Sequence, residues 1–354
     1  MKPPLVLLAT AFLIGSAVIL FAATDLSSEA LQMQGFDPLA NKLIPPDSKL
    51  EKLATGFKWT EGPVWVNDRT QGSHLFFAEI PSNSIRELYG PGEVKIFLQP
   101  SGYVGSASYG GPEPGSNGMT LDTKGRLTIA GHARRNIWRL EYLRPHAQIT
   151  VLADSYQGKK LNSPNDLVYK SDGSLYFTDP PYGLRTQSDT DKSKELPFNG
   201  VYRIPNAASV QPGSAPQNAK LQLIIKDLPR PNGIAFSPDE KILYIADSGP
   251  KKIWMRYEVA PDGSVRTGRV FFDASSDQKV GGPDGIKVDM QGNLYGAGPG
   301  GIWIFSPAGK HVASLSIPER VGNLAWGDSD RKSLYITASS SVYRIRTNAV
   351  GEKP

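Results

Sequence analysis

A unit of strand, turn and strand recurs six times along this 354-residue chain, and no other feature constrains the fold as strongly. Each copy has a short apolar strand, a turn, and a second apolar strand that often carries an aromatic residue. A further strand pair follows most copies, as at residues 136–140 and 253–257. Each repeat therefore supplies about four short strands, the content of one propeller blade. The copies start at Gly62, Gly118, Asp166, Gly233, Gly285 and Leu324.

This repetition predicts an all-β fold, a six-bladed β-propeller over residues 31–354. A β-sandwich would also have short strands, but it would not need six copies of one motif. A single open sheet of more than about ten strands would curl or split. Radial stacking of blades buries both faces of each sheet and leaves only short edges. The frequent glycines (36) and prolines (29) fit many strands joined by tight turns.

The composition excludes several classes of function. The formal charge is +5, but lysines and arginines are scattered, whereas nucleic-acid binding requires a concentrated basic surface. We therefore expect no nucleic-acid partner. The chain has no cysteine, which excludes disulfides, zinc–thiolate sites and cysteine nucleophiles.

The N-terminal residues 1–30 differ from the rest of the chain. Residues 5–23 form an apolar or small run behind a single lysine, and a polar stretch follows it. This pattern is typical of a signal peptide or of an uncleaved membrane anchor, followed here by a linker. We expect an exported protein, periplasmic or extracellular, with a membrane tether through 5–23 if no cleavage occurs.

One position of the repeat, directly before the first strand of each copy, is always an acid or its amide. Any single copy can be explained as a turn, because Asn-Gly and Asp-Gly are common turn dipeptides. Six equivalent positions of a propeller, however, would form one ring at a mouth of the central channel. The six residues are Glu61, Asn117, Asn165, Asn232, Asp284 and Asn323.

A ring of buried carboxylates and amides favours a bound cation. Unpaired carboxylates are costly to bury, and a divalent ion coordinated by carboxylate and amide oxygens removes that cost. All-oxygen ligation favours Ca²⁺, with Mg²⁺ and Mn²⁺ as lesser candidates. Zn²⁺ is less natural, because cysteine is absent and the four histidines are scattered.

Three residues are candidates for binding substrate near this ring. Asn117 belongs to the ring, where it would contact substrate hydroxyls or hold the metal through water. His132 ends a blade strand near the same face, and a purely structural role explains it equally well. Tyr182 begins the polar loop 180–200, which interrupts one blade and would overhang the mouth.

Several motifs together resemble the SMP-30/gluconolactonase/luciferin-regenerating-enzyme family, and its bacterial gluconolactonase-like branch in particular. The resemblance covers about residues 45 to 346. The motifs are Trp-Thr-Glu-Gly-Pro-Val-Trp at 59–65, Ser-Asn-Gly-Met-Thr-Leu-Asp at 116–122, Leu-Asn-Ser-Pro-Asn-Asp-Leu at 161–167, Phe-Thr-Asp-Pro-Pro-Tyr-Gly-Leu at 177–184, Pro-Asn-Gly-Ile-Ala-Phe-Ser-Pro-Asp at 231–239, Gly-Pro-Asp-Gly-Ile at 282–286 and Leu-Tyr-Ile-Thr-Ala at 334–338.

The resemblance implies a six-bladed propeller with one catalytic divalent metal in the central channel, usually calcium. It would place the metal ligands at Glu61, Asn165, Asn232 and Asp284, and it would make Asp284 the general base. No Gly-x-Ser-x-Gly nucleophile motif is present. We therefore expect a hydrolase of sugar lactones, in which the metal polarises the lactone carbonyl and Asp284 activates water.

Two alternatives remain open from the sequence. A phosphotriesterase or other ester hydrolase could use the same metal site, with the carboxylate as nucleophile. A non-catalytic propeller could bind calcium structurally and hold a small molecule. The sequence fixes neither the oligomeric state nor the individual lactone.

Overall fold

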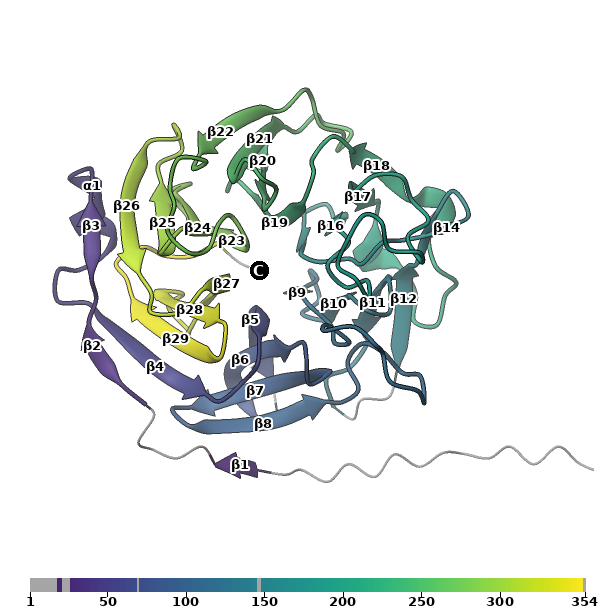
Figure 1. The fold of residues 1–354 in the computed structure, drawn as a ribbon, viewed down its shortest axis with the longest axis horizontal. Helices are drawn as coiled ribbons and strands as arrows, with labels where there is room; N and C mark the ends of the chain where they lie inside the picture. The colour runs from purple at the N-terminus through teal and green to yellow at the C-terminus, as the bar shows by residue number, and fades with distance from the viewer. Residues whose placement is uncertain (1–17, 21–25, 69, 145–147, 353–354) are drawn as a thin grey trace, which may run out of the picture.

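The six repeats fold into six antiparallel sheets around a central axis, as Figure 1 shows in a computed structural model that describes residues 18–20, 26–68, 70–144 and 148–352. Each sheet has four principal strands, and the first strand of each lies nearest the axis. The predicted all-β, six-bladed propeller is confirmed. In blade order the strands are β5 (Thr60–Asp68), β6 (Gly72–Glu79), β7 (Ser84–Gly90) and β8 (Glu93–Leu98); β9 (Met119–Leu121), β10 (Leu127–Gly131), β11 (Asn136–Leu140) and β12 (Ile149–Ala153); β15 (Leu167–Tyr169), β16 (Leu175–Asp179), β17 (Gly200–Ile204) and β18 (Gln222–Ile225); β19 (Pro231–Phe236), β20 (Ile242–Asp247), β21 (Ile253–Glu258) and β22 (Arg269–Asp273); β23 (Ile286–Val288), β24 (Leu294–Gly298), β25 (Gly301–Phe305) and β26 (His311–Ser316); and β27 (Val321–Gly327), β28 (Ser333–Ala338) and β29 (Ser341–Arg346), completed by β4 (Lys49–Thr55).

The ring is closed by a strand from the N-terminal side of the chain. Strand β4 pairs antiparallel with β29, so the sixth blade combines both ends of the propeller sequence. The hydroxyl of Thr60, at the start of β5, donates a 3.0 Å hydrogen bond to the carbonyl of Ser341, which joins the first blade to the sixth. This closure removes an open seam from the ring.

The segment before β4 adds to the outer edges of two blades. Strand β2 (Ser28–Ala30) pairs with β4, and β3 (Met33–Gly35) pairs with β26. The short helix α1 (Leu39–Leu43) lies between β3 and β4. The predicted export segment 5–23 lies outside the described residues except for β1 (Val18–Leu20), which pairs with β8. The domain boundary at residue 30 stays a prediction.

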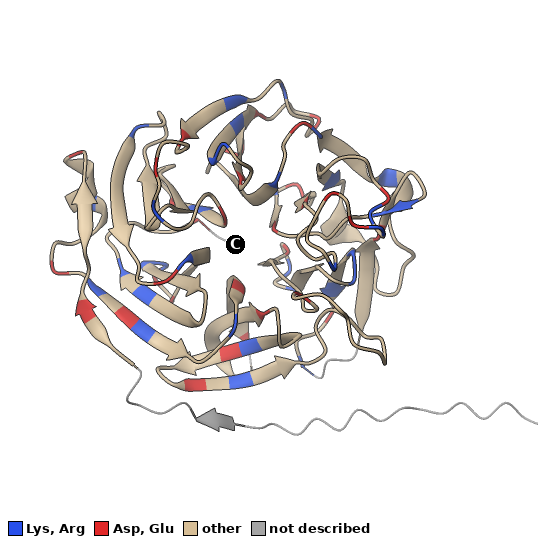
Figure 2. Cartoon of the chain, in the orientation of Figure 1, with Lys and Arg blue, Asp and Glu red and all other residues tan. Residues whose placement is uncertain are grey.

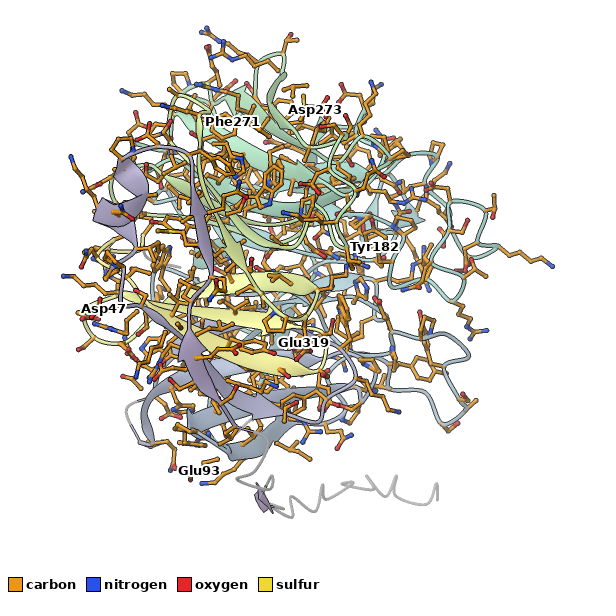
Figure 3. All side chains as sticks on the ribbon, turned by 60° about the vertical axis from the view of Figure 1, so that its left-hand side comes forward. Asp47, Glu93, Tyr182, Phe271, Asp273 and Glu319 are labelled. Atoms are coloured by element: carbon orange, nitrogen blue, oxygen red, sulfur yellow. The ribbon has the colours of Figure 1, made fainter. Side chains whose placement is uncertain are left out.

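The hydrophobic core is divided among the contacts between blades. Each of six buried apolar clusters draws its members from two neighbouring blades. Between the fourth and fifth blades, for example, Trp254 stacks on Trp303 with ring centroids 5.7 Å apart. Side chains fill the spaces between neighbouring sheets (Figure 3). Because every blade is packed on both faces, the inner strand ends are held in fixed positions around the axis.

Two long connections lie at the end of the propeller where the inner strands begin. Residues 99–118 join β8 to β9, and residues 180–199 join β16 to β17. Tyr109 of the first connection donates a hydrogen bond to the carbonyl of Gly183 in the second. On the outer side lie the hairpin β13 (Ser155–Tyr156) and β14 (Lys159–Lys160) and two 3₁₀ turns, Ala207–Ser209 and Asn218–Lys220.

Charged residues are interspersed around the propeller, as Figure 2 shows. Acidic and basic side chains both occur along the outer strands. Within the described part of the chain, no helix is long and apolar enough to cross a membrane.

Candidate metal centre and its pocket

The six equivalent polar residues lie at the inner end of the blades, and each blade contacts the next at this level. A Cβ atom on Gly62 would lie 2.1 Å from the carbonyl oxygen of Asn117, and one on Gly233 would lie 2.2 Å from that of Asp284. Only glycine permits so close an approach of two backbones. The Asn-Gly and Asp-Gly pairs are therefore not ordinary hairpin turns; they pack the inner ends of adjacent blades together.

Glu61 and Asp284 place two buried carboxylates in this ring. Their exposed fractions are 3% and 7%. Burial, reinforced by the charge of the neighbouring Asp284, raises the pKa of Glu61 well above its ordinary value. Burial likewise raises the pKa of Asp284 to about 7, against an opposing effect of Arg320. Both carboxylates are therefore costly to ionise unless a cation joins them.

Asparagines flank both carboxylates. Asn323 lies beside Glu61 and Asn232 lies beside Asp284, where each amide opposes the effect of burial on the pKa of the carboxyl group. The Nδ2 atom of Asn232 donates to Oγ of Ser248 at 2.9 Å. Asn165 belongs to the same ring and is 4% exposed. The structure thus brings the four predicted ligands, Glu61, Asn165, Asn232 and Asp284, to one end of the channel.

Asn117 is the ring member with an unsatisfied side chain. Its residue is 4% exposed, and its Oδ1 atom has no hydrogen-bond partner among the described residues. Buried carbonyl oxygens without a partner are uncommon and mark a missing donor, water or ion. Its position therefore fits either of its predicted roles, a contact to substrate or a water-mediated contact to a metal.

Asp166 is a ring-level carboxylate that the sequence analysis did not single out as a site residue. It occupies the position where four of the other blades have glycine, and its charge acts on both Glu61 and Asp284. Its Oδ2 atom accepts a 3.4 Å hydrogen bond from Asn323 across the channel. The departure from Asn-Gly to Asn-Asp in the third copy is the sequence signal that could have identified it.

His132 is held away from the open pocket. It is fully buried, its Nε2 lies 2.7 Å from the Glu113 carboxylate, and its Nδ1 lies 3.2 Å from the carbonyl of Pro164. Gly183 covers the ring so closely that a Cβ there would lie 2.7 Å from it. These contacts support the structural interpretation of His132: it joins the connection 99–118 to the segment that carries Asn165.

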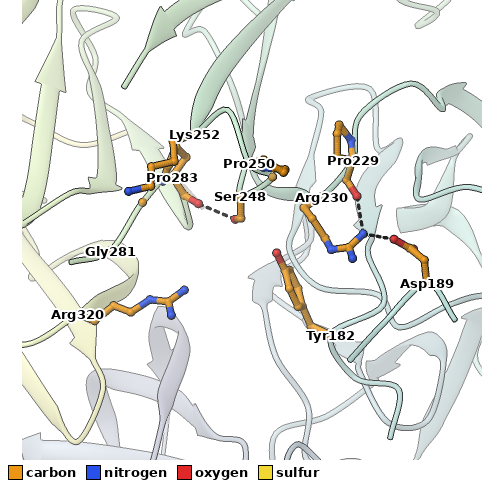
Figure 4. Close-up of a pocket in the computed structure, with 12 residues that line it drawn as sticks. Tyr182, Asp189, Pro229, Arg230, Ser248, Pro250, Lys252, Gly281, Pro283 and Arg320 are labelled. Atoms are coloured by element: carbon orange, nitrogen blue, oxygen red, sulfur yellow. Dashed lines mark hydrogen bonds and ion pairs between the residues drawn. The ribbon is translucent and has the colours of Figure 1, made fainter. Parts of the chain in front are cut away.

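Tyr182 lines a pocket of about 640 Å³ that lies beside the ring (Figure 4). Its hydroxyl points into the pocket near Ser248. Burial and the charge of Asp284 raise the pKa of Tyr182 to about 12. The pocket is connected to the ring through Ser248, which bonds Asn232, and through Pro283, which precedes Asp284. Its other lining residues are Asp189, Pro229, Arg230, Gly249, Pro250, Lys252, Gly281, Gly282 and Arg320.

The ring residues fit a divalent ion by their chemistry. They offer two buried carboxylates whose pKa values are raised, together with amide oxygens and the unsatisfied Oδ1 of Asn117. Within the described ranges, no group of three or more His, Cys, Asp or Glu side chains is arranged to hold a metal, so amide oxygens would have to contribute. Such an all-oxygen set suits Ca²⁺ better than Zn²⁺.

By its fold and its site, the protein is a six-bladed β-propeller with a ring of carboxylates and amides at one end of the channel and a pocket beside that ring. The family model described as "SMP-30/Gluconolactonase/LRE-like region" matches residues 59–340. The chain belongs to this family, as the sequence motifs had indicated.

Individual relatives agree with the family assignment. The gluconolactonase of Zymomonas mobilis is 36% identical over 361 residues, which cover 99% of this chain and 96% of that protein. The lactonohydrolase oryL of Aspergillus oryzae is 26% identical over 247 residues, covering 64% of this chain and 53% of the relative. Among solved structures, a gluconolactonase of Xanthomonas campestris superposes with a TM-score of 0.73 at 27% identity, covering 91% of this chain and 97% of that one.

Proposed function

We propose that this chain is a hydrolase of sugar lactones, with one divalent metal ion held by Glu61, Asn165, Asn232 and Asp284. The observation that carries this proposal is the pair of buried carboxylates, Glu61 and Asp284, beside an open pocket of about 640 Å³. A pocket of this size accommodates a sugar ring. The similarity to gluconolactonases over nearly the whole chain supports the same reaction.

Calcium is the ion that we propose for this site. The donors are carboxylate and amide oxygens, which Ca²⁺ accepts in flexible arrangements of six to eight ligands. Asn117 would complete the set through water or would instead contact substrate. When bound, such an ion supplies Lewis-acid polarisation of a carbonyl oxygen.

Asp284 is the residue that we propose as general base. Water adds to the lactone carbonyl carbon while Asp284 accepts its proton, and the ring C–O bond then breaks to give a hydroxy acid. Arg320 favours the ionised, basic form of Asp284, because its positive charge opposes the effect of burial on the pKa. The proton taken from water ends on the released alcohol oxygen.

Tyr182 provides a hydrogen-bond donor in the pocket beside Asp284. With a pKa of about 12, its hydroxyl keeps its proton at neutral pH. It lies near both Ser248 and Asp284, so it can donate to a substrate hydroxyl or ring oxygen without competing as a second base. Tyr182 therefore orients the sugar rather than activating water.

The experiment is a hydrolysis screen with D-glucono-1,5-lactone, an aryl ester and a phosphotriester, each with chelator and with added Ca²⁺. We expect lactone hydrolysis that requires the metal, and much slower reaction with the other two classes. Preferential phosphotriester hydrolysis would support the alternative enzyme class. Tight Ca²⁺ binding without any turnover would support the non-catalytic alternative.

Export is a second part of the proposal. The apolar run at residues 5–23 follows one lysine and precedes a polar linker, which is typical of a signal peptide or membrane anchor. Fractionation of a bacterium expressing the full chain tests this. Activity in the periplasmic or membrane fraction is expected; activity confined to the cytoplasm, with residues 5–23 intact, would contradict it.

A further inference from the structure

The wall of the pocket carries an excess of positive charge. Its twelve lining residues include three basic side chains, Arg230, Lys252 and Arg320, and one acidic side chain, Asp189. Asp189 is bonded to Arg230. The formal charge of the wall is therefore +2, three cations less one anion. A divalent ion among the three carboxylates of Glu61, Asp166 and Asp284 would leave one formal negative charge in the ring, so the wall and the ring together would still carry one positive charge in excess.

Arg320 is the basic residue of the pocket wall whose guanidinium N–H groups are free to bind a ligand. Its guanidinium lies over the Trp59 ring at 5.3 Å, and it forms no hydrogen bond or ion pair with any residue that the structure describes; the hydrogen bond from Ser339 goes to the Arg320 backbone carbonyl. In Figure 4 it points into the pocket opposite Arg230, with the Tyr182 hydroxyl between them. Among the residues that the structure describes, the Nζ atom of Lys252 donates a hydrogen bond only to the carbonyl of Asp277, at 3.2 Å. Planar guanidinium groups held in this way are suited to bind carboxylate or phosphate.

We propose that Arg320, with Arg230 and Lys252, binds an anionic substituent of the substrate, so that the chain prefers lactones of acidic sugars to neutral lactones. This inference rests on the proposed lactone hydrolysis. The carbonyl end of the substrate would face the ring, and a carboxylate or phosphate elsewhere on the sugar would face the arginines. The carboxylate or phosphate of the substrate would then stay outside the ring, whose own carboxylates would repel it.

The test compares three lactones of one sugar: D-glucono-1,5-lactone, its 6-phosphate, and the glucaro-1,5-lactone with a carboxylate at C6. The wild-type protein with Ca²⁺ should show a kcat/KM at least about tenfold higher for one or both anionic lactones than for the neutral one, the factor expected for one charge-assisted contact. The two anionic arms distinguish phosphate from carboxylate. A neutral lactone that is hydrolysed as efficiently as both would overturn the inference.

Charge-removing variants test which residues are responsible. Arg320→Gln should lower the ratio of anionic to neutral kcat/KM by about tenfold, whereas Arg320→Lys should retain part of it. The ratio of the two kcat/KM values is the useful measurement. Arg320 also influences Asp284, but that effect changes the hydrolysis of the anionic and the neutral lactone by the same factor and so cancels in the ratio. Lys252→Gln should lower the same ratio by a smaller factor.

Lys241→Gln is the matched control. It also removes one positive charge, but Lys241 lies in the turn after β19, at the opposite end of the strand from the ring, with a side chain that is 79% exposed. Its ratio should equal that of the wild type. An unchanged ratio in Arg320→Gln, or an equal loss in Lys241→Gln, would contradict the proposed site.

The two proposals fail in different ways. If none of the three lactones is hydrolysed with Ca²⁺, the proposed function is wrong. If the neutral lactone is hydrolysed and anionic substrates gain nothing, only the inference about charge is wrong. Competitive inhibition of neutral-lactone hydrolysis by gluconate, 6-phosphogluconate and glucarate provides a second measurement. The latter two carry an anionic group in addition to the carboxylate at C1, and we expect them to inhibit at about tenfold lower concentration than gluconate.

Discussion

Asn232 donates a 2.9 Å hydrogen bond from Nδ2 to Oγ of Ser248. Ser248 in turn donates to the carbonyl of Pro283, at 2.6 Å, directly before Asp284. Two proposed ligands on neighbouring blades are therefore joined through one hydroxyl. The amide nitrogen of Asn232 donates to Ser248, which leaves its oxygen available to a cation.

Ser248→Ala should weaken metal binding by about tenfold or more, because residues that orient a ligand contribute on this scale. The reduction should appear in the Ca²⁺ concentration needed for half-maximal lactone hydrolysis and in calorimetric Ca²⁺ titration, while kcat at saturating Ca²⁺ falls less. Ser276→Ala is the matched control, since Ser276 is exposed. Equal Ca²⁺ affinity in Ser248→Ala and wild type would contradict the orienting role.

Asp284→Asn should reduce kcat by at least about a hundredfold, since an amide cannot act as general base. The same substitution should stabilise the metal-free protein at neutral and alkaline pH. The folded chain holds the pKa of Asp284 at about 7, above its ordinary value of 3.8, so folding favours the protonated acid. Its stabilising contribution is complete below about pH 4 and is lost as the pH rises through 7.

Thermal unfolding in chelator, measured from pH 4 to pH 9, tests this pH dependence. The Tm difference between Asp284→Asn and wild type should grow in favour of the variant between pH 4 and 7 and then level off. A difference that stays constant over this range would mean that Asp284 is not the buried, hard-to-ionise group described above.

Gly233→Ala should disrupt the ring without altering any polar side chain. The added Cβ would lie 2.2 Å from the carbonyl oxygen of Asp284, so the fourth and fifth blades would have to separate. We expect a loss of about 3 kcal/mol in the free energy of unfolding, typical of overpacking, together with loss of Ca²⁺ binding. Gly90→Ala is the control, because its Cβ would meet nothing within 4 Å and its φ is not positive. Denaturant unfolding of both variants provides the comparison.

Asp179→Ala should destabilise the segment that carries Asn165. The Asp179 carboxylate accepts two backbone hydrogen bonds of 2.8 Å, from Asn162 and Ser163. Removing this buried acceptor leaves both N–H groups unsatisfied, at a cost of about 3 kcal/mol. Burial raises the pKa of Asp179 to about 7, so Asp179→Asn should lose less stability than Asp179→Ala. Equal stability of the two variants in denaturant would contradict this account.

The repeat determined how much could be predicted from the sequence. Because six copies share one register, the blades and the common level of Glu61, Asn232 and Asp284 followed from spacing alone. The closure by β4 has no copy to align with, and it depends on long-range pairing with β29. Whether the grouped residues bind metal stays a prediction.

The residues around the pocket were harder to predict. Ser248 and Arg320 lie in connections whose shape depends on how neighbouring blades pack, and neither belongs to the repeated motif. Arg230 precedes Asn232 by two residues, so its position near the ring could have been inferred. His132 was considered for substrate binding, but its burial against Glu113 depends on the connection 99–118, whose path no periodicity specifies.

The most direct test of the central claim is a Ca²⁺ titration of chelator-treated protein, followed by D-glucono-1,5-lactone hydrolysis in the same samples. We expect one Ca²⁺ bound per chain and activity that rises in proportion to occupancy. Both binding and activity should be lost in a Glu61→Gln, Asp284→Asn double variant that remains folded. Full lactone hydrolysis by the metal-free protein, or by the folded double variant, would contradict it.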